Sequence, residues 1–394
     1  MEKERNNARK ILIVANVAQE HIRKFHIHII QFLQSQGWQV DVACRMDVPV
    51  PEADQTFDLL CDRNPLKGGL LKSAGMLCDI IEKNQYDAVI CNTLTGSIIA
   101  RLGMQKLRRK IKGSDAVPTL FYIVHGLHFF EGASAPRWIM GYPMEKLLAP
   151  MTDVLITINA ADDKMVRKCL KPGAFERIPG IGCKLDRFRD CVVSEEERMH
   201  IRESFGIGKD DLVLTYVAEI NDNKNQGMLL DVMDEVRKEI PGAKLLLIGP
   251  AHDDGRLETQ AKEQAEAEGR ANDVIFAGWR NDVPQLLNCA DIYVASSKSE
   301  GLPINLIEAM ACNLPVVAGK NRGHSEIINH GQNGFLVERG DSKAMTEYVL
   351  KLAKDANLRE SLVHQAQKDI EQYASENVHQ VLEEILEKYT YSGK

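Results

Sequence analysis

The sequence lacks long hydrophobic runs, paired cysteines and a dinucleotide fingerprint. No apolar stretch approaches the ~20 residues needed to cross a bilayer, so we expect no integral membrane protein. None of the nine cysteines forms a Cys-x-x-Cys pair, which argues against a zinc ribbon or a thioredoxin-type site. The first strand is followed by no Gly-x-Gly-x-x-Gly, so a dinucleotide site there is not expected. The polar first ten residues contain no apolar signal-peptide core, and we expect a cytoplasmic protein.

Charge is distributed unevenly along the 394 residues. Residues 1–190 carry 27 basic and 21 acidic side chains, whereas residues 191–394 carry 22 and 35. The basic excess is concentrated in a segment without acidic residues, namely Arg101, Lys106, Arg108, Arg109, Lys110 and Lys112. Leucines, methionine and isoleucine alternate with these charges at helical spacing. This pattern is compatible with a peripheral contact to an anionic membrane at the inner face of the cell, or with an ordinary solvated helix face.

Short β-branched runs alternate with helical segments, and the series occurs twice. The first series has expected strands at residues 11–14, 40–43, 88–91, 119–124 and 154–158. The second has them at residues 212–217, 244–248, 274–277, 292–295 and 314–317, followed by a helical tail. This order predicts an α/β protein with two doubly wound Rossmann-like domains facing a central cleft. We expect the domains to span residues 1–190 and 191–376, with a last helix at 377–394 packing back on the first domain.

Two glutamates eight residues apart mark the richest segment of the second domain. Glu300 follows a strand, and a helix should begin near Pro303, because proline favours a first helical turn. Exposed backbone N–H groups at this helix start would bind phosphate, and the carboxylates would bind sugar and ribose hydroxyls. The alternative is two solvated glutamates near a helix N-terminus. The residues expected to bind such a sugar nucleotide, as the donor of a sugar, are Gly301, Leu302, Pro303, Ile304, Asn305 and Glu308.

Four stretches of this half resemble one enzyme family. Residues 299–303, 308–311, 315–318 and 331–336 look like the donor-binding half of family 4 retaining glycosyltransferases of GT-B fold, whose signature is Glu-x7-Glu. The resemblance extends over about residues 9–375. It implies transfer of a sugar, with retention, from a UDP-sugar or another nucleotide sugar to a saccharide or lipid-linked acceptor. Glu300 is then the expected catalytic carboxylate, holding the hydroxyls of the sugar.

Two further loops resemble donor-binding loops of this family. Lys224 matches the lysine of the phosphate loop and is expected to pair with the diphosphate as a point charge. The preceding arginine position of that loop holds Glu219, which removes one cation. Arg280 lies in a segment similar to the loop that borders the nucleobase, although a simple strand-to-helix turn explains it as well.

Histidines mark the end of a strand in the first domain. His125 matches the family's His-Gly position, which faces the donor sugar and diphosphate, and is the second expected catalytic residue. The alternative is a loop histidine with satisfied hydrogen bonds. The segment around His125 resembles a branch that builds capsular or exopolysaccharide on a lipid carrier. The residues expected on the acceptor side are His21, His26 and His128.

No metal or cofactor is expected. His21, His26 and His28 are spaced by five and two residues, which does not put all three on one α-helical face. The sequence also contains no Asp-x-Asp, the usual metal–diphosphate motif of the other glycosyltransferase fold. Nucleic acid is not an expected partner. Two alternative functions stay open: a nucleotide-sugar 2-epimerase of the same fold, and a non-catalytic nucleotide-sugar-binding protein.

Overall fold

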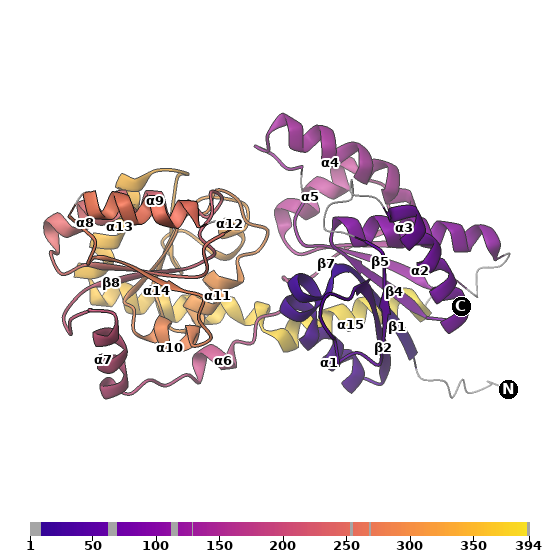
Figure 1. The fold of residues 1–394 in the computed structure, drawn as a ribbon, viewed down its shortest axis with the longest axis horizontal. Coiled ribbons are helices and arrows are strands. Elements are labelled where there is room, and N and C mark those ends of the chain that lie inside the picture. The colour runs from indigo at the N-terminus through magenta and orange to yellow at the C-terminus, as the bar shows by residue number, and fades with distance from the viewer. Residues whose placement is uncertain are drawn as a thin grey trace. The chain divides into compact units, whose positions relative to one another are not determined.

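The chain divides into two compact units. The computed structural model describes residues 9–61, 69–111, 117–127, 129–252, 255–267 and 269–391. Unit 1 contains the chain up to Gly182 together with the residues from Ser375 on, and unit 2 is Cys183–Ala374. Figure 1 colours the chain from indigo to yellow, and the yellow C-terminal helix lies among the indigo and purple elements of unit 1.

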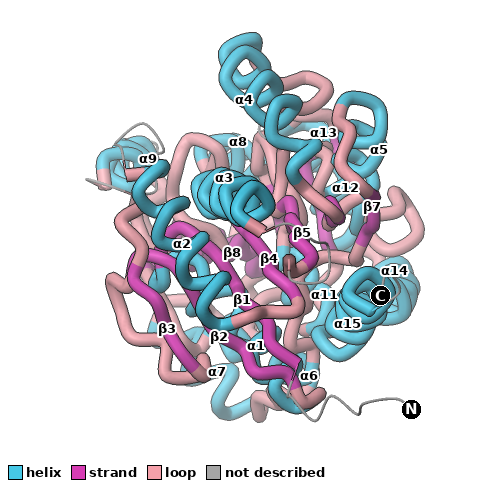
Figure 2. The backbone as a smooth tube through the Cα atoms, turned by 90° about the vertical axis from the view of Figure 1, so that its right-hand side faces the viewer, coloured by secondary structure: helices cyan, strands magenta, loops and turns pink. Residues whose placement is uncertain are grey.

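Unit 1 is built on a parallel sheet that is seven-stranded within the described residues. The strands, in spatial order, are β3 (Gln55–Asp58), β2 (Trp38–Arg45), β1 (Arg9–Val17), β4 (Ala88–Asn92), β5 (Thr119–Val124), β6 (Val154–Thr157) and β7 (Ala174–Arg177). The helical elements are the π-helix η1 (Ala18–His26), α1 (Ile27–Ser35), α2 (Leu70–Asn84), α3 (Leu94–Lys110), α4 (Ala135–Leu148), the short 3₁₀ helix η4 (Ala149–Met151), α5 (Ala160–Cys169) and α15 (Ser375–Tyr391). Figure 2 shows α2 and α3 on one face of the sheet, and α1 and α15 on the other. Because both faces are covered, the central strands are almost entirely apolar and buried.

The C-terminal helix α15 is part of unit 1. Arg9 at the start of β1 donates to Glu387 over 2.9 Å, and Lys388 pairs with Glu176 of β7 at 2.7 Å. The backbone carbonyl of Tyr389 accepts a hydrogen bond from the Thr119 side chain at the start of β5. These contacts attach the last helix to β1, β5 and the edge strand β7 of unit 1.

Unit 2 repeats the architecture with a six-stranded parallel sheet in its described part. The strands, in spatial order, are β10 (Val274–Gly278), β9 (Lys244–Ile248), β8 (Val213–Val217), β11 (Ile292–Ala295), β12 (Val316–Gly319) and β13 (Phe335–Val337). The helical elements are α6 (Asp186–Arg189), α7 (Glu195–Ser204), α8 (Gly227–Glu239), α9 (Arg256–Ala267), α10 (Val283–Asn288), α11 (Ile304–Ala311), α12 (His324–Ile327), α13 (Ser342–Lys354), α14 (Ala356–Asp369) and the 3₁₀ helix η5 (Ile370–Tyr373). The predicted fold class, two doubly wound Rossmann-like units, is confirmed.

The division between the units differs from the predicted one. It falls after Gly182 rather than after residue 190. The reason is α6, which packs on α11 of unit 2. Phe188 of α6 is buried in the core of unit 2 and its carbonyl lies 3.8 Å from the Cys312 thiol.

The basic segment of α3 is not one solvated face. Arg101 is completely buried: its Nη1 donates to Glu145 over 2.8 Å, and its guanidinium covers the ring of Tyr122. Arg108 pairs with Asp153 on the loop before β6. Lys110 pairs with acidic side chains of α2, and Lys112 lies outside the described residues. Arg101 therefore belongs neither to a membrane-facing surface nor to a solvated helix face, and the ion pairs of Arg108 and Lys110 reduce the positive charge that they offer to a membrane.

None of the helices in the described part of the chain is both long enough and apolar enough to cross a membrane.

Both sheets reverse their strand order at one place. In unit 1 this switch point lies between β1 and β4, and in unit 2 it lies between β8 and β11. Ligands of open parallel sheets bind outside the carboxyl ends of the strands at such switch points. The loops that follow these four strands and β5 carry most of the residues singled out in the sequence.

Candidate functional site

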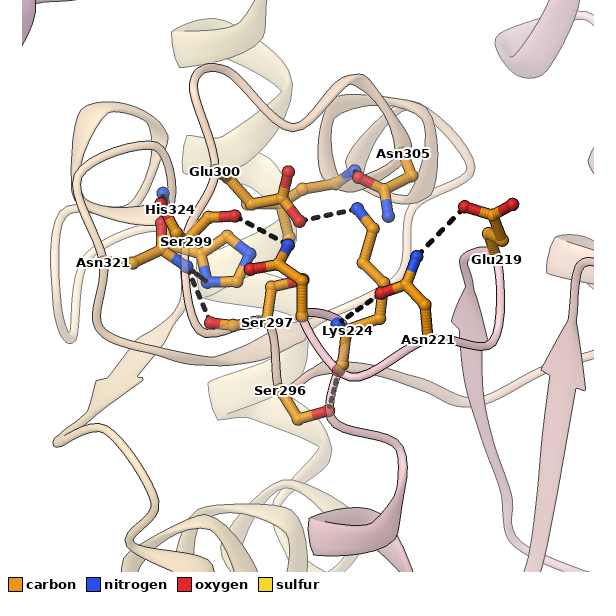
Figure 3. Close-up of polar contacts among 12 residues, drawn as sticks. Glu219, Asn221, Lys224, Ser296, Ser297, Ser299, Glu300, Asn305, Asn321 and His324 are labelled. Atoms are coloured by element: carbon orange, nitrogen blue, oxygen red, sulfur yellow. Dashed lines mark hydrogen bonds and ion pairs between the residues drawn. The ribbon is translucent and has the colours of Figure 1, made fainter. Parts of the chain in front are cut away.

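A lysine–glutamate ion pair occupies the switch point of unit 2 (Figure 3). Lys224 lies in the loop after β8, and Glu300 lies in the loop after β11. The Lys224 Nζ is 2.6 Å from Glu300 Oε1, and both side chains are largely buried. The structure thus brings together the residue predicted for the diphosphate and the residue predicted for the sugar.

Hydrogen bonds between the two loops hold this pair in place. The Lys224 backbone N–H donates to Asn221 Oδ1 at 3.0 Å, and the Ser296 hydroxyl donates to the Lys224 carbonyl at 2.8 Å. Asn223 donates to the carbonyl of Ser299. The position of the ion pair is therefore set by side chains of both loops rather than by the pair alone.

A third segment, which sequence reasoning missed, supports the Glu300 loop from the other side. Asn321 donates to the Ser297 carbonyl at 2.9 Å, and Arg322 donates to the Glu300 carbonyl at 3.1 Å. His324 is buried and its Nδ1 donates to the Gly319 carbonyl at 2.6 Å. The signal in the sequence was the polar run Lys-Asn-Arg-Gly-His, residues 320–324, directly after the buried strand β12.

Helix α11 starts where the sequence predicted. Pro303 is its N-cap residue and Ile304 is its first residue. The first N–H groups of a helix have no partner within it, so Ile304 and Asn305 present donors at this end, as does Leu302 just before it. The Asn305 side chain donates to the Val217 carbonyl at 2.6 Å, which attaches the helix start to the end of β8. Gly301 precedes this turn.

Glu308 lies on the second turn of α11 and is partly buried. Burial raises its pKa to about 7, and the positive charge of Arg187 opposes this rise. Within the described residues the carboxylate makes no hydrogen bond or ion pair. Glu308 is therefore poised close to neutral pH between its neutral and charged forms, and no contact joins it to the Lys224–Glu300 pair.

Glu219, which stands at the arginine position of the family's phosphate loop, has polar neighbours of its own. Its Oε2 accepts from Asn221 at 3.0 Å, and its Oε1 lies 2.9 Å from His252 Nδ1. Since Asn221 also binds the backbone of Lys224, Glu219 belongs to the network that shapes this loop. The substitution of an anion for a cation leaves Lys224 as the residue predicted to bind the diphosphate.

Arg280 is engaged locally. It donates to Asp282 at 2.7 Å, and its guanidinium covers the ring of Phe205 at 5.8 Å. In the described residues no contact joins Arg280 to Lys224 or Glu300, and its donor-binding role stays a prediction.

A histidine cluster occupies the switch point of unit 1. His125 follows β5, and its ring lies 5.2 Å from that of His21 and 5.4 Å from that of His26, between centroids. The π-helix η1 carries the other two rings, which are 5.3 Å apart. His28 is elsewhere: it stacks on His379, and its ring nitrogen bonds the Ile181 carbonyl. The predicted position His128 lies outside the described residues.

The His125 ring is neutral and fixed in orientation. Its Nε2 lies 3.0 Å from Asn92 Oδ1 at the end of β4. Because a carboxamide oxygen only accepts, Nε2 carries the proton and Nδ1 keeps a lone pair. Burial lowers the pKa of His125 to about 3, with a further contribution from His21. At neutral pH this lowered pKa favours the neutral imidazole.

A pocket of about 400 Å³ lies next to this cluster inside unit 1. His21, His125 and Glu145 are among its lining residues. Glu145 is held by Arg101 and also accepts a hydrogen bond from Tyr122 at 3.2 Å. This buried network forms a rigid polar wall of the pocket.

A larger hollow of about 700 Å³ in unit 2 lies at the amino ends of its strands, next to Asp211, Asp291 and Pro315. Ligands of doubly wound sheets bind at the opposite edge, so we assign no site there.

The comparisons with known proteins agree with this geometry. Residues 197–369 match the family model described as glycosyl transferases group 1, and residues 10–159 match the model described as glycosyl transferase 4-like. EpsD of Bacillus subtilis strain 168, which is named as a glycosyltransferase, is 35% identical over 382 residues, 97% of each chain. Two doubly wound parallel-sheet units are the architecture of the GT-B class of glycosyltransferases, and the chain belongs to family 4 of that class.

Two further relatives extend the comparison. UDP-Gal:alpha-D-GlcNAc-diphosphoundecaprenol alpha-1,3-galactosyltransferase of Escherichia coli is 23% identical over 352 residues, 85% of each chain. The crystal structure of Anabaena Alr3699/HepE in complex with UDP and glucose superimposes with a TM-score of 0.78 at 19% identity, covering 97% of this chain and all of that one. At this identity the superposition shows the shared fold alone.

Proposed function

We propose that this glycosyltransferase moves a sugar from a UDP-sugar, with retention at the anomeric carbon, to a saccharide or lipid-linked acceptor in polysaccharide biosynthesis. The observation that carries the proposal is the Lys224–Glu300 pair next to the start of α11. A cation, unpaired helix N–H groups and a carboxylate meet there at the switch point of a doubly wound sheet. This combination suits a ligand with a diphosphate and a hydroxyl-rich sugar.

The ion pair implies an exchange of partners when the donor binds. The diphosphate competes with Glu300 for the Lys224 ammonium, and the released carboxylate becomes free to accept hydrogen bonds from sugar hydroxyls. In the transfer step the bond between the anomeric carbon and the phosphate oxygen breaks, and a bond to the acceptor oxygen forms. The acceptor proton moves to the leaving phosphate. Lys224 and the α11 amides would stabilise the charge on that phosphate without a metal ion.

His125 would orient a sugar hydroxyl. Its neutral ring accepts through Nδ1, since Nε2 donates to Asn92. A hydrogen-bond acceptor in this position suits a hydroxyl better than a phosphate. The UDP donor is supported by the Escherichia coli relative, which is named for UDP-Gal.

A lipid-linked acceptor and a peripheral membrane contact are supported by helix α4. One part of this helix exposes large apolar side chains: Ile139 is 73% exposed, Met140 68% and Leu147 71%. Gly141 and Glu145 of the same helix line the pocket beside His125. An apolar helix surface next to a polar pocket fits a substrate with a lipid tail and a sugar head, such as the diphosphoundecaprenol named for the Escherichia coli relative. The proposed membrane surface thus moves from α3 to α4.

The test is a transfer assay with a panel of UDP-sugars and lipid-linked saccharides, in which product anomers are assigned by NMR. We expect an α-linked product from an α-linked donor, and activity that persists in EDTA. Glu300→Gln should lower kcat by more than tenfold with a smaller change in donor affinity, because its charge acts on the developing positive charge at the anomeric carbon.

The outcome also separates the alternatives. Conversion of a UDP-sugar into its epimer without acceptor would identify an epimerase. Donor binding without any turnover would identify a binding protein, and an inverted product would contradict the proposed front-face route.

A further inference from the structure

Three histidines of unit 1 converge although they are far apart in the sequence. His21 and His26 come from η1 after β1, and His125 comes from the loop after β5. One ring nitrogen can be chosen from each so that all three lie within 4.8 Å of one another. Three imidazoles at this spacing form a donor set suited to Zn²⁺ and similar divalent ions.

The local helix type brings the first two rings together. The η1 segment is a π-helix, in which the hydrogen bonds run from i to i+5. Residues 21 and 26 are five apart, so they share a face of this helix, whereas an α-helix would separate them. A π-helix is uncommon, and such segments occur frequently at functional sites.

The buried ring of His26 has a nitrogen for which the described residues offer no hydrogen bond. His26 is 1% exposed, and its Nε2 has no hydrogen-bond partner among the described residues. A buried polar atom without a partner is costly and calls for an explanation such as a bound ion. The rings of His21 and His125 are the aromatic neighbours of His26.

The ring of His125 makes the kind of hydrogen bond that usually orients a metal-binding histidine. A ligating imidazole typically donates its other N–H to a carbonyl or carboxylate oxygen, which fixes the ring and the tautomer. His125 donates through Nε2 to Asn92 Oδ1 at 3.0 Å, which leaves the lone pair of Nδ1 available for a ligand. Asn92 is 1% exposed and is the last residue of β4.

We propose that His21, His26 and His125 form a three-histidine binding site for Zn²⁺ or a similar borderline-soft divalent cation. Tetrahedral Zn–N bonds of 2.0–2.1 Å require nitrogens about 3.4 Å apart, so the rings close by roughly 1 Å from their present spacing. The fourth position faces the 400 Å³ pocket, which His21 and His125 line and which gives water access to the ion. Three protein ligands with an open position form a site that exchanges its fourth ligand.

A second group of possible ligands, Cys78, Asp79 and Glu82 on α2, is a weaker candidate. The Lys110 ammonium already lies 2.9 Å from Glu82 and 3.5 Å from Asp79. This group therefore has a cation from the chain itself.

The proposed site has a consequence for transfer, which rests on the proposed function. The ion takes the Nδ1 lone pair of His125, which the donor sugar would otherwise use. Zn²⁺ should therefore inhibit transfer, and a chelator should restore it. Binding itself does not depend on that function and is measured separately.

The experiment titrates Co²⁺ and Zn²⁺ into the full chain, followed by visible absorption and calorimetry. We expect one ion per chain, with a tetrahedral Co²⁺ spectrum that lacks a sulfur-to-metal charge-transfer band. Loss of an outer-sphere partner costs 10–100-fold in metal affinity, so loss of a ligand in His26→Gln should cost more than ~100-fold. His28→Gln, which removes a neighbouring histidine outside the cluster, and Cys78→Ser should bind as the wild type does.

His21→Gln serves as the second variant if His26→Gln does not fold, because His21 is only partly buried. It should lose binding to the same degree. The proposal is overturned if folded His26→Gln or His21→Gln binds Zn²⁺ as tightly as the wild type. A Co²⁺ spectrum typical of cysteine ligation would overturn it as well. Tight binding without any inhibition of transfer would keep the site and contradict the role of His125 in the proposed function.

Discussion

Removing the charge of the partly buried Glu308 carboxylate should have opposite effects on stability and on donor binding. Replacing it in Glu308→Gln keeps the shape of the side chain and removes its charge. The folded protein holds the Glu308 proton up to a pKa of about 7, whereas the unfolded chain releases it near the ordinary value of 4.5. The contribution of Glu308 to the free energy of unfolding is therefore largest below pH 4.5, where the carboxyl is protonated in both states. This contribution is lost as the pH rises to about 7.

The size of the effect follows from these two values. Each pKa unit corresponds to 1.36 kcal/mol, so Glu308 costs the folded state about 3 kcal/mol above pH 7. Glutamine stays neutral at every pH and avoids this cost. Glu308→Gln should therefore be more stable than the wild type by about 3 kcal/mol at pH 8, and similar to it at pH 4.5. If Glu308 grips the ribose hydroxyls of the donor, the same variant should bind UDP roughly tenfold more weakly at pH 8.

The assay is urea unfolding at pH 4.5 and pH 8, with calorimetric titration of UDP at pH 8. Glu347→Gln on the exposed face of α13 is the matched control, and it should change stability by less than ~0.5 kcal/mol at either pH. Equal stability differences for Glu308→Gln at the two pH values would refute a raised pKa of the Glu308 carboxyl in the folded protein. Unchanged affinity for UDP would refute its role in donor binding.

Further outcomes are expected at three other places. Lys224→Ala should weaken UDP by tenfold or more, about 1.5 kcal/mol, and leave uridine unaffected; equal losses in calorimetry would contradict a phosphate contact. Arg101→Ala should cost about 3–5 kcal/mol in urea unfolding because it strands a buried carboxylate, whereas the exposed Arg109→Ala should cost less than ~0.5. Ile139→Ser combined with Leu147→Ser should reduce co-sedimentation with anionic vesicles several-fold at unchanged stability, and wild-type protein that ignores such vesicles would exclude a membrane role for α4.

Much of the fold is predictable because buried strands need apolar sequence on both faces. The central strands β1, β4, β5, β8 and β11 read as continuous hydrophobic runs and were located to within a few residues. The edge strands β3 and β7 were missed, since Gln55–Asp58 and Ala174–Arg177 are short, polar and partly exposed. An edge strand is held by backbone pairing with one neighbour, and this leaves little trace in side-chain composition.

The candidate site divides in the same way. The proximity of Lys224 and Glu300 could be predicted from the sequence, because each residue follows a buried strand and the carboxyl ends of parallel strands share one edge. The histidine cluster was not, because its spacing was judged on an α-helix and the chain forms a π-helix there. Arg101 illustrates a third limit: its partner Glu145 is 44 residues away, and local charge patterns carry no information on such a contact.

The attachment of α15 to unit 1 bears on how the protein is made. A ribosome completes the whole of Cys183–Ala374 before it synthesises the helix that binds Arg9, Thr119 and Glu176. The first unit to emerge is thus the last to be finished, and it waits with one face of its sheet incompletely covered while the second unit folds. A stop codon directly after that of Ala374 would consequently damage the N-terminal unit and leave the other unit's contacts intact, which reverses the usual expectation for truncated chains.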